Sequence, residues 1–178
     1  MTVPVLDLSP FRDGTAQDKR NVATVFDRAC RDIGFLVIAG HGVSEATQAA
    51  LYDAGKSFFD QDLSKKICVR RLHHEQNRGY IPYGEERLVR MHGGESPPDF
   101  KEVFAIGPCK VPNETYYTQE AAYPNFAPNL WPESPPSLRP AMEAYYRAME
   151  ALMGTLCQVA ALALEAVLKI YVPIKTMT

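Results

Sequence analysis

The sequence lacks most of the features that mark metal-binding, secreted or membrane proteins. Its four cysteines lie far apart, whereas zinc sites need closely spaced pairs of ligands. The longest run without a charged side chain, residues 151–164, is too short to cross a bilayer as a helix. The N-terminus has neither the basic start nor the apolar stretch of a secretory signal. These absences predict a cytoplasmic protein without a membrane partner.

Basic charge is not in excess either. The chain has 19 Lys and Arg against 21 Asp and Glu, which argues against a nucleic-acid partner. One basic cluster is interpreted as a solvated surface patch; it consists of Lys65, Lys66, Arg70 and Arg71. Two cysteines, Cys30 and Cys157, fall inside apolar helical patterns and are expected to be buried. The 178 residues, of which 46% are hydrophobic, suffice for one domain with a core.

The first 43 residues predict two short strands around one helix. Residues 4–8 form an apolar segment typical of an edge strand. Thr15 and Asp18 have the spacing of a helix-capping pair, and Gly34 is placed to end that helix. Residues 35–39 are continuously apolar and predict a fully buried strand. The glycines on both sides of His41 then predict a sharp turn, in which His41 makes a structural hydrogen bond.

The rest of the chain predicts helices on both sides of a long irregular segment. Helices are expected at about 44–59 and 63–69, and a long one from about 137 to 165 with an apolar stripe. Residues 73–137 hold 10 of the 14 prolines and predict loops with short strands at 79–83 and 100–106. In the second strand, Phe100 and Phe104 are expected to face inward. So long an irregular segment is typical of a lid or a site wall.

Six segments in order along the chain match one pattern. They are Pro4-Val-Leu-Asp-Leu8, the stretch 34–43 with its Gly-His-Gly turn, Phe58-Phe59 followed by Lys65-Lys66, Arg78-Gly-Tyr80, Asp99-Phe-Lys-Glu102 and Asn129-Leu-Trp-Pro132. In this order and spacing they resemble the opening half of non-haem Fe(II) oxygenases that use 2-oxoglutarate, the group that includes isopenicillin N synthase. The resemblance implies an α+β fold, a mainly helical region with a few strands that packs around a double-stranded β-helix (jelly roll).

The same resemblance implies which residues such an enzyme needs. Its iron is held by a His-x-Asp pair and a later His, and 2-oxoglutarate by an Arg-x-Ser pair that grips the carboxylate. Neither motif occurs in this sequence. We therefore expect residues 1–165 to be the N-terminal domain with most of the barrel missing, and 166–178 to be an atypical tail from truncation or splicing. On this interpretation the chain has no catalytic residue and binds neither Fe(II) nor 2-oxoglutarate alone.

One group of residues offers a substitute for the metal ligands. His73, His74 and Glu75, with His92 further on, supply histidines and a carboxylate. They lie in the proline-rich segment, in the wrong half of such a fold. A solvated loop is the better interpretation.

The resemblance also implies residues that approach the mouth of the active site. These candidate substrate-binding residues are Asn77, Arg78, Tyr80 and Tyr83. Arg78 suits a substrate carboxylate, but its pairing with Glu85, Glu86 or Asp99 to hold the loops together is the better interpretation. Asp99, Lys101 and Glu102 are expected to be structural, and Trp131 to be a packing anchor rather than a stacking platform.

Three interpretations of function remain open. The first is a truncated Fe(II) oxygenase whose parent hydroxylates, desaturates or cyclises a small molecule. The second is a non-catalytic binding or regulatory module, whose partner covers the exposed face of the 137–165 helix. The third is a split enzyme, in which a second polypeptide supplies the barrel and covers the same helix.

Overall fold

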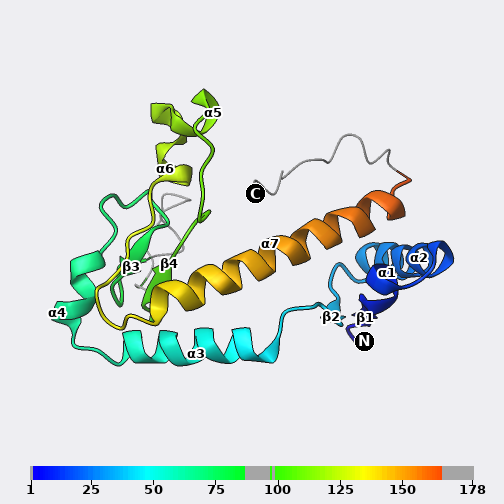
Figure 1. The fold of residues 1–178 in the computed structure, drawn as a ribbon, viewed down its shortest axis with the longest axis horizontal. Coiled ribbons are helices and arrows are strands. Elements are labelled where there is room, and N and C mark those ends of the chain that lie inside the picture. The colour runs from blue at the N-terminus through cyan, green and yellow to red at the C-terminus, as the bar shows by residue number, and fades with distance from the viewer. Residues whose placement is uncertain (1, 87–96, 98, 166–178) are drawn as a thin grey trace. The chain divides into compact units, whose positions relative to one another are not determined.

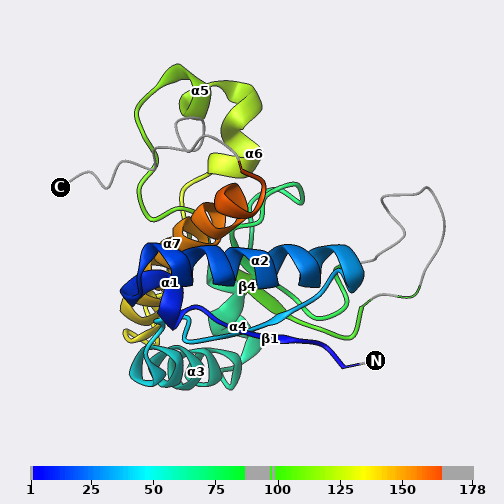
Figure 2. The same cartoon turned by 90° about the vertical axis from the view of Figure 1, so that its right-hand side faces the viewer.

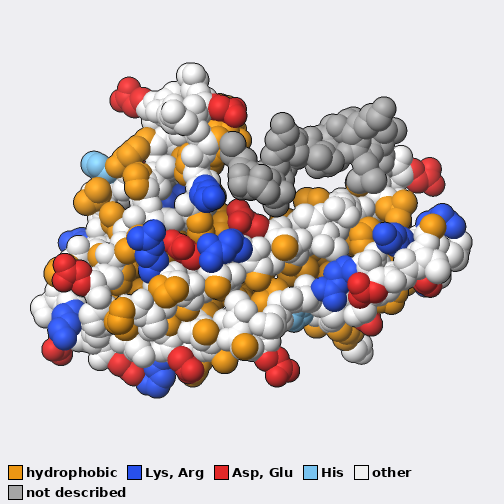
Figure 3. Space-filling model, in the orientation of Figure 1, with side chains coloured by type: hydrophobic (Ala, Val, Ile, Leu, Met, Phe, Trp, Pro, Cys, Tyr) orange, Lys and Arg blue, Asp and Glu red, His pale blue; other side chains and the backbone are white. Residues whose placement is uncertain are grey.

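The computed structural model describes residues 2–86, 97 and 99–165 (Figure 1). The described part of residues 1–44 and 147–178 forms one compact unit, here called unit 1, and residues 45–146 form unit 2. The helix that begins at Leu138 runs from unit 2 into unit 1. Among the described residues, no helix is both long enough and apolar enough to span a membrane. On the face drawn in Figure 3, acidic and basic side chains are interspersed with hydrophobic ones.

The described chain is mainly helical, with four short strands. Its elements, in order, are β1 (Val5–Asp7), α1 (Ser9–Asp13), α2 (Ala16–Asp32), β2 (Val37–Ala39), α3 (Glu45–Phe59), α4 (Leu63–Lys66), η1 (Ile67–Val69), β3 (Gly79–Ile81), β4 (Val103–Ala105), α5 (Thr115–Thr118), η3 (Glu120–Ala122), α6 (Tyr123–Phe126) and α7 (Leu138–Ala163). This is the predicted α+β composition, with the expected helices and strands shortened by a few residues at their ends. The short helix α1, which has a proline in its first turn, was not predicted, and neither were the short helices α5 and α6 in the segment expected to form loops.

Unit 1 is built on the predicted capping pair and turn. Thr15 accepts a hydrogen bond from the backbone N–H of Asp18, while the Asp18 carboxylate accepts from the N–H of Thr15, so prediction and geometry agree. In the turn after β2, the N–H of Val43 donates to Nδ1 of His41 at 3.0 Å. That is the structural hydrogen bond expected of His41. The unit's core consists of Leu6, Leu8, Phe11, Val22 and Val159.

Within the described residues, the sheet of unit 1 is covered on one face only. Strands β1 and β2 run parallel, with Val5 opposite Val37. In the segment that contains β2, Leu36 and Ile38 pack against the core, whereas Phe35 is 73% exposed. The prediction of a fully buried strand is therefore wrong within the described chain, because a two-stranded sheet here has one layer packed against it rather than two.

The two cysteines expected to be buried are exposed. Cys30 follows the buried Ala29 on α2, and Cys157 follows the core residue Leu156 on α7. A helix turns by about 100° per residue, so a side chain next to a core position points away from the core. The apolar stripe of each helix does face the core, but both cysteines lie outside that stripe.

Unit 2 is organised around Phe58 and a second small sheet. Strands β3 and β4 are antiparallel, with Tyr80 opposite Phe104. The rings of Phe59, Tyr80 and Phe104 approach the fully buried Phe58 edge to face, with centroids 4.9 to 5.9 Å away. Phe104 thus faces inward as predicted. Phe100 does not: it lies before β4 begins and is 81% exposed.

Helix α7 buries part of its apolar stripe within the chain. Met142 packs against the core of unit 2, and Leu152, Leu156 and Val159 belong to the core of unit 1. Met149 and Met153 are exposed. The predicted tail, residues 166–178, lies outside the described residues. The short helices α5 and α6 lie beside each other at one end of unit 2 (Figures 1 and 2).

Candidate functional site

The four predicted substrate-binding residues lie on or beside β3 and differ in burial. Arg78 and Tyr80 point inward and are buried, whereas Asn77 and Tyr83 are exposed. Gly79, between the inward pair, has a positive φ of 80° and lies close to the carbonyl of Val69 and the side chain of Leu130. Of these four residues, which are close together in the sequence, only Asn77 and Tyr83 are accessible to solvent.

Arg78 holds the segment that contains α6 against β3. Its side chain is 5% exposed; Nε donates to the carbonyl of Ala127 at 3.0 Å and Nη1 to that of Asn77 at 2.7 Å. Nη2 donates to the carbonyl of Asn125. Burial lowers the pKa of the guanidinium, which still carries its charge at neutral pH. Its recorded partners in the described chain are thus backbone carbonyls rather than carboxylates.

The carboxylates proposed as partners of Arg78 pair with other cations. Glu85 binds Arg70 and Arg71, each at 3.1 Å. Glu86 and Asp99 both bind Lys101. The expected pairing of Arg78 with this acidic group is therefore wrong. The carbonyls of the segment that contains α6 are the hydrogen-bond partners of Arg78 instead, because they lie within reach of its buried guanidinium.

Tyr80 belongs to a buried polar group with Glu102 and Lys66. Its hydroxyl donates to Oε2 of Glu102 at 2.5 Å, and Nζ of Lys66 binds the same oxygen at 2.8 Å and the carbonyl of Phe59 at 2.9 Å. Burial, the hydrogen bond to Glu102 and its charge all raise the pKa of the Tyr80 phenol. Burial also raises the pKa of Glu102, but the hydrogen bonds from Lys66 and Tyr80, with the charge of Lys66, outweigh it and leave that pKa lowered. The structural role predicted for Glu102 agrees with this arrangement.

The basic cluster is the expected solvated patch only in part: Lys65 and Arg70 are exposed, whereas the side chains of Lys66 and Arg71 are not. Lys66 is only 7% exposed, and the side chain of Arg71 is also buried, between Glu85 and the carbonyl of His74. Both cations have partners far along the chain, in the segment that follows β3. The basic residues lie close together in the sequence, which suggested a surface patch. The acidic partners of Arg71 and Lys66 lie 14 and 36 residues further along the chain, so the local sequence does not reveal them.

The residues present do not fit an iron site. His73, His74 and Glu75 are all exposed, and His92 lies outside the described residues. The ring of His73 faces that of Tyr123, with centroids 6.3 Å apart. Within residues 2–86, 97 and 99–165, no three His, Cys, Asp or Glu side chains gather closely enough to hold a metal ion.

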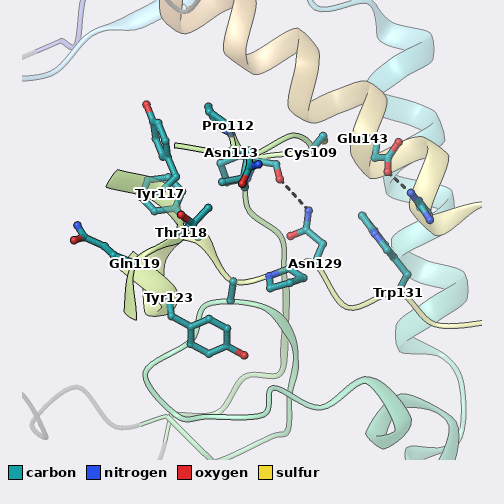
Figure 4. Close-up of a pocket in the computed structure, with 16 residues that line it drawn as sticks. Cys109, Pro112, Asn113, Tyr117, Thr118, Gln119, Tyr123, Asn129, Trp131 and Glu143 are labelled. Atoms are coloured by element: carbon teal, nitrogen blue, oxygen red, sulfur yellow. Dashed lines mark hydrogen bonds and ion pairs between the residues drawn. The ribbon is translucent and has the colours of Figure 1, made fainter. Parts of the chain in front are cut away.

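Unit 2 contains a hollow of about 640 Å³ that the sequence did not predict (Figure 4). Aromatic side chains line it from α5, α6 and the segment before α7, among them Tyr117, Tyr123, Phe126 and Trp131. Trp131 also packs against Phe104, at 6.3 Å between centroids, as expected of a packing anchor. The one available signal was the proline-rich character of residues 73–137, which predicted loops that form a lid or a site wall.

Comparison with known families identifies the chain. Residues 3–134 match the family described as "non-haem dioxygenase in morphine synthesis N-terminal", which covers well over half of the sequence. The chain belongs to this family, the N-terminal region of the non-haem dioxygenases that use 2-oxoglutarate and Fe(II). The resemblance seen in the six segments is thereby confirmed.

Individual relatives agree with this assignment. The chain is 30% identical to validamycin A dioxygenase of Streptomyces hygroscopicus subsp. limoneus over 162 residues, which are 90% of this chain and 42% of that protein. It is 32% identical over 166 residues to a 2-oxoglutarate-Fe(II) type oxidoreductase of Aspergillus fumigatus, covering 91% of this chain and 47% of the relative. The chain thus spans a little under half the length of these relatives.

Solved structures show the same fold. A 2OG-Fe(II) oxygenase family protein from Caulobacter crescentus matches with a TM-score of 0.74 at 22% identity, over 93% of this chain and 49% of that one. A rice dioxygenase for auxin oxidation matches with a TM-score of 0.60 at 21% identity, over 92% of this chain and 46% of that one. At these identities the likeness concerns the fold alone.

Proposed function

We propose that this chain is the N-terminal part of a non-haem Fe(II) dioxygenase that acts on a small molecule and consumes 2-oxoglutarate and O₂. The family match over residues 3–134 carries the proposal. Hydroxylation, desaturation or ring closure is the reaction class. When bound in such an enzyme, the iron supplies oxygen activation. The ligands to iron and to 2-oxoglutarate come from outside residues 1–165, which form the N-terminal domain and are inactive alone.

Within that enzyme, the two pairs of residues on and beside β3 have different roles. Asn77 and Tyr83 are exposed and available to a substrate at the mouth of the active site. Arg78 and Tyr80 position this segment from behind, through carbonyls and Glu102. Substituting Asn77→Ala or Tyr83→Ala in the complete enzyme should raise KM more than it lowers kcat. Arg78→Lys should instead lower the stability of the fold.

The first test is the transcript beyond the codon for Glu165. We expect an open frame encoding His-x-Asp, a later His and Arg-x-Ser. The encoded protein, purified with Fe(II), should convert 2-oxoglutarate to succinate in the presence of O₂. The 178-residue chain should show no saturable binding of Mn(II) with 2-oxoglutarate by titration calorimetry. A transcript without such a frame, or stoichiometric binding by the 178-residue chain, would contradict the proposal.

A non-catalytic binding module is the second candidate, and one observation favours it. Among the described residues of unit 1, the register partners Val5 and Val37 are exposed on the sheet, and so is Phe35 just before β2. Exposed apolar side chains gathered on one face mark an interaction surface. A 178-residue chain that is soluble, monomeric and cooperatively folded would favour this function. A chain that aggregates unless its missing half is co-expressed would favour the dioxygenase, or its split form.

A further inference from the structure

The hollow of unit 2 is separate from the residues assigned to the dioxygenase mouth. None of Asn77, Arg78, Tyr80 and Tyr83 lines it; its walls come from residues 108–131 and the first turns of α7. In Figure 4, Tyr117 and Tyr123 lie on one side and Trp131 and Glu143 on the other. Its volume of about 640 Å³ falls within the range of small-molecule sites.

Two polar clamps hold the walls of this hollow in place. The Asn129 side chain accepts from the N–H of Gly107 at 2.7 Å and donates to the carbonyls of Gly107 and Pro108 at 3.2 and 3.3 Å. Arg78 binds the carbonyls of Asn125 and Ala127 from behind. Both clamps fix backbone that forms the lining, so a ligand would meet walls that are already ordered. Ordered walls reduce the entropy lost on binding.

The lining includes four aromatic side chains and carries no net charge. The rings of Tyr117 and Phe126 meet edge to face with centroids 5.0 Å apart, and the Arg139 guanidinium lies 5.6 Å from the Trp131 ring centre. Arg139 and Glu143 are the charged side chains of the lining, and they bind each other at 2.9 Å. The amides of Asn113 and Gln119 lie exposed at the rim. Such a surface suits an uncharged ligand with one flat apolar part and a few hydrogen-bonding groups.

We propose that this hollow binds an uncharged small molecule that carries an aromatic ring. The ring lies among Tyr117, Phe126 and Trp131, and the polar groups of the ligand meet the amides of Asn113 and Gln119. An anionic ring compound binds more weakly, because the one cation of the lining, Arg139, is neutralised by Glu143. The proposal does not rest on the dioxygenase function, since no residue of the proposed substrate mouth lines the hollow.

The only tryptophan of the chain provides a direct readout, because Trp131 lines the hollow. The 178-residue chain is titrated with para-hydroxybenzamide, and tryptophan emission is followed under selective excitation. We expect a saturable change, with affinity for the neutral amide about fivefold or more above that for para-hydroxybenzoate. A change linear in concentration, or equal affinity for both probes, would overturn the proposal.

Variants locate the binding. Tyr117→Ala removes one wall and should weaken binding of the amide by about five- to tenfold. The control Tyr52→Ala, an exposed tyrosine on α3 outside the hollow, should leave it unchanged. Where circular dichroism shows Tyr117→Ala unfolded, Asn113→Ala at the exposed rim replaces it, with an expected loss of about threefold. Equal binding by the hollow variant and the control would place the probe elsewhere and reject the site.

Discussion

Tyr80 and Glu102 share a 2.5 Å hydrogen bond between β3 and the segment leading into β4, and Lys66 binds the same carboxylate oxygen. Lys66 also lies 5.6 Å from the centre of the Tyr80 ring. One carboxylate therefore satisfies a buried phenol and a buried ammonium at once. Removing it leaves the phenol without this partner and the ammonium with the Phe59 carbonyl, although both residues are more than nine-tenths buried.

Glu102→Gln should lower the free energy of unfolding by about 2–3 kcal/mol, somewhat below the range for a fully buried pair because Glu102 itself is partly exposed. Glu86→Gln is the matched control, since Glu86 binds the half-exposed Lys101, and it should cost less than about 1 kcal/mol. Urea unfolding of both variants measures the difference. Equal losses would show that Lys66 does not depend on its counter-charge.

The lowered pKa of Glu102 makes this contribution depend on pH. Its pKa in the folded chain lies below its ordinary value of 4.5, so the carboxylate binds protons more readily in the unfolded chain. Stability from Glu102 is therefore fully present above about pH 4.5 and is lost as the pH falls through the folded pKa. Unfolding wild type and Glu102→Gln at stepped pH should show their difference shrinking below pH 4.5. A difference in unfolding free energy that stays constant at every pH below 4.5 would contradict the lowered pKa of Glu102.

Gly107→Ala should release the clamp formed by Arg78. A Cβ at this position would overlap Nη2 of Arg78, so the guanidinium must leave the carbonyls of Asn125 and Ala127. We expect a loss of about 2–3 kcal/mol in urea unfolding. Gly55→Ala on α3 is the control, because a Cβ there meets open space and favours the helix by about 0.5–1 kcal/mol. Two variants of equal stability would mean that Arg78 is free to move.

Thr15→Ala should remove one half of the capping box on α2. The backbone N–H of Asp18 loses its acceptor, at a cost of about 1 kcal/mol in thermal or urea unfolding. Thr24→Ala on the same helix is the control. Its hydroxyl donates to the carbonyl of Arg20 inside the helix, so the change to alanine should be neutral or slightly stabilising. A larger loss from Thr24→Ala would argue against the cap.

The longer helices were predictable because their signals are local. The capping pair at Thr15 and Asp18 and the spacing of apolar residues on α7 involve neighbours within a few turns. The partners of charged residues were not predictable in this way. Arg78 and Lys66 find theirs 47 and 36 residues away, and nothing in the local sequence distinguishes a buried guanidinium from a surface one.

The candidate site was predictable as a segment but not in its geometry. The family motif placed Asn77, Arg78 and Tyr80 together, and the strand that follows decides which of them face inward. Concave surfaces such as the hollow beside Trp131 depend on how several short helices and loops meet. That arrangement is set by packing between distant segments, for which sequence periodicity carries no signal.

The place of Val159 in unit 1 has a consequence for synthesis of the chain. It belongs to the same core as Leu6 and Leu8, which leave the ribosome more than a hundred residues earlier. At ordinary elongation rates that interval is on the order of ten seconds, much longer than a helix or a loop needs to form. The first strand and helices must therefore wait with their apolar side chains uncovered. Before residue 159 is synthesised, the apolar side chains of unit 1 lack part of their core, and a chaperone that binds them then would prevent aggregation most effectively.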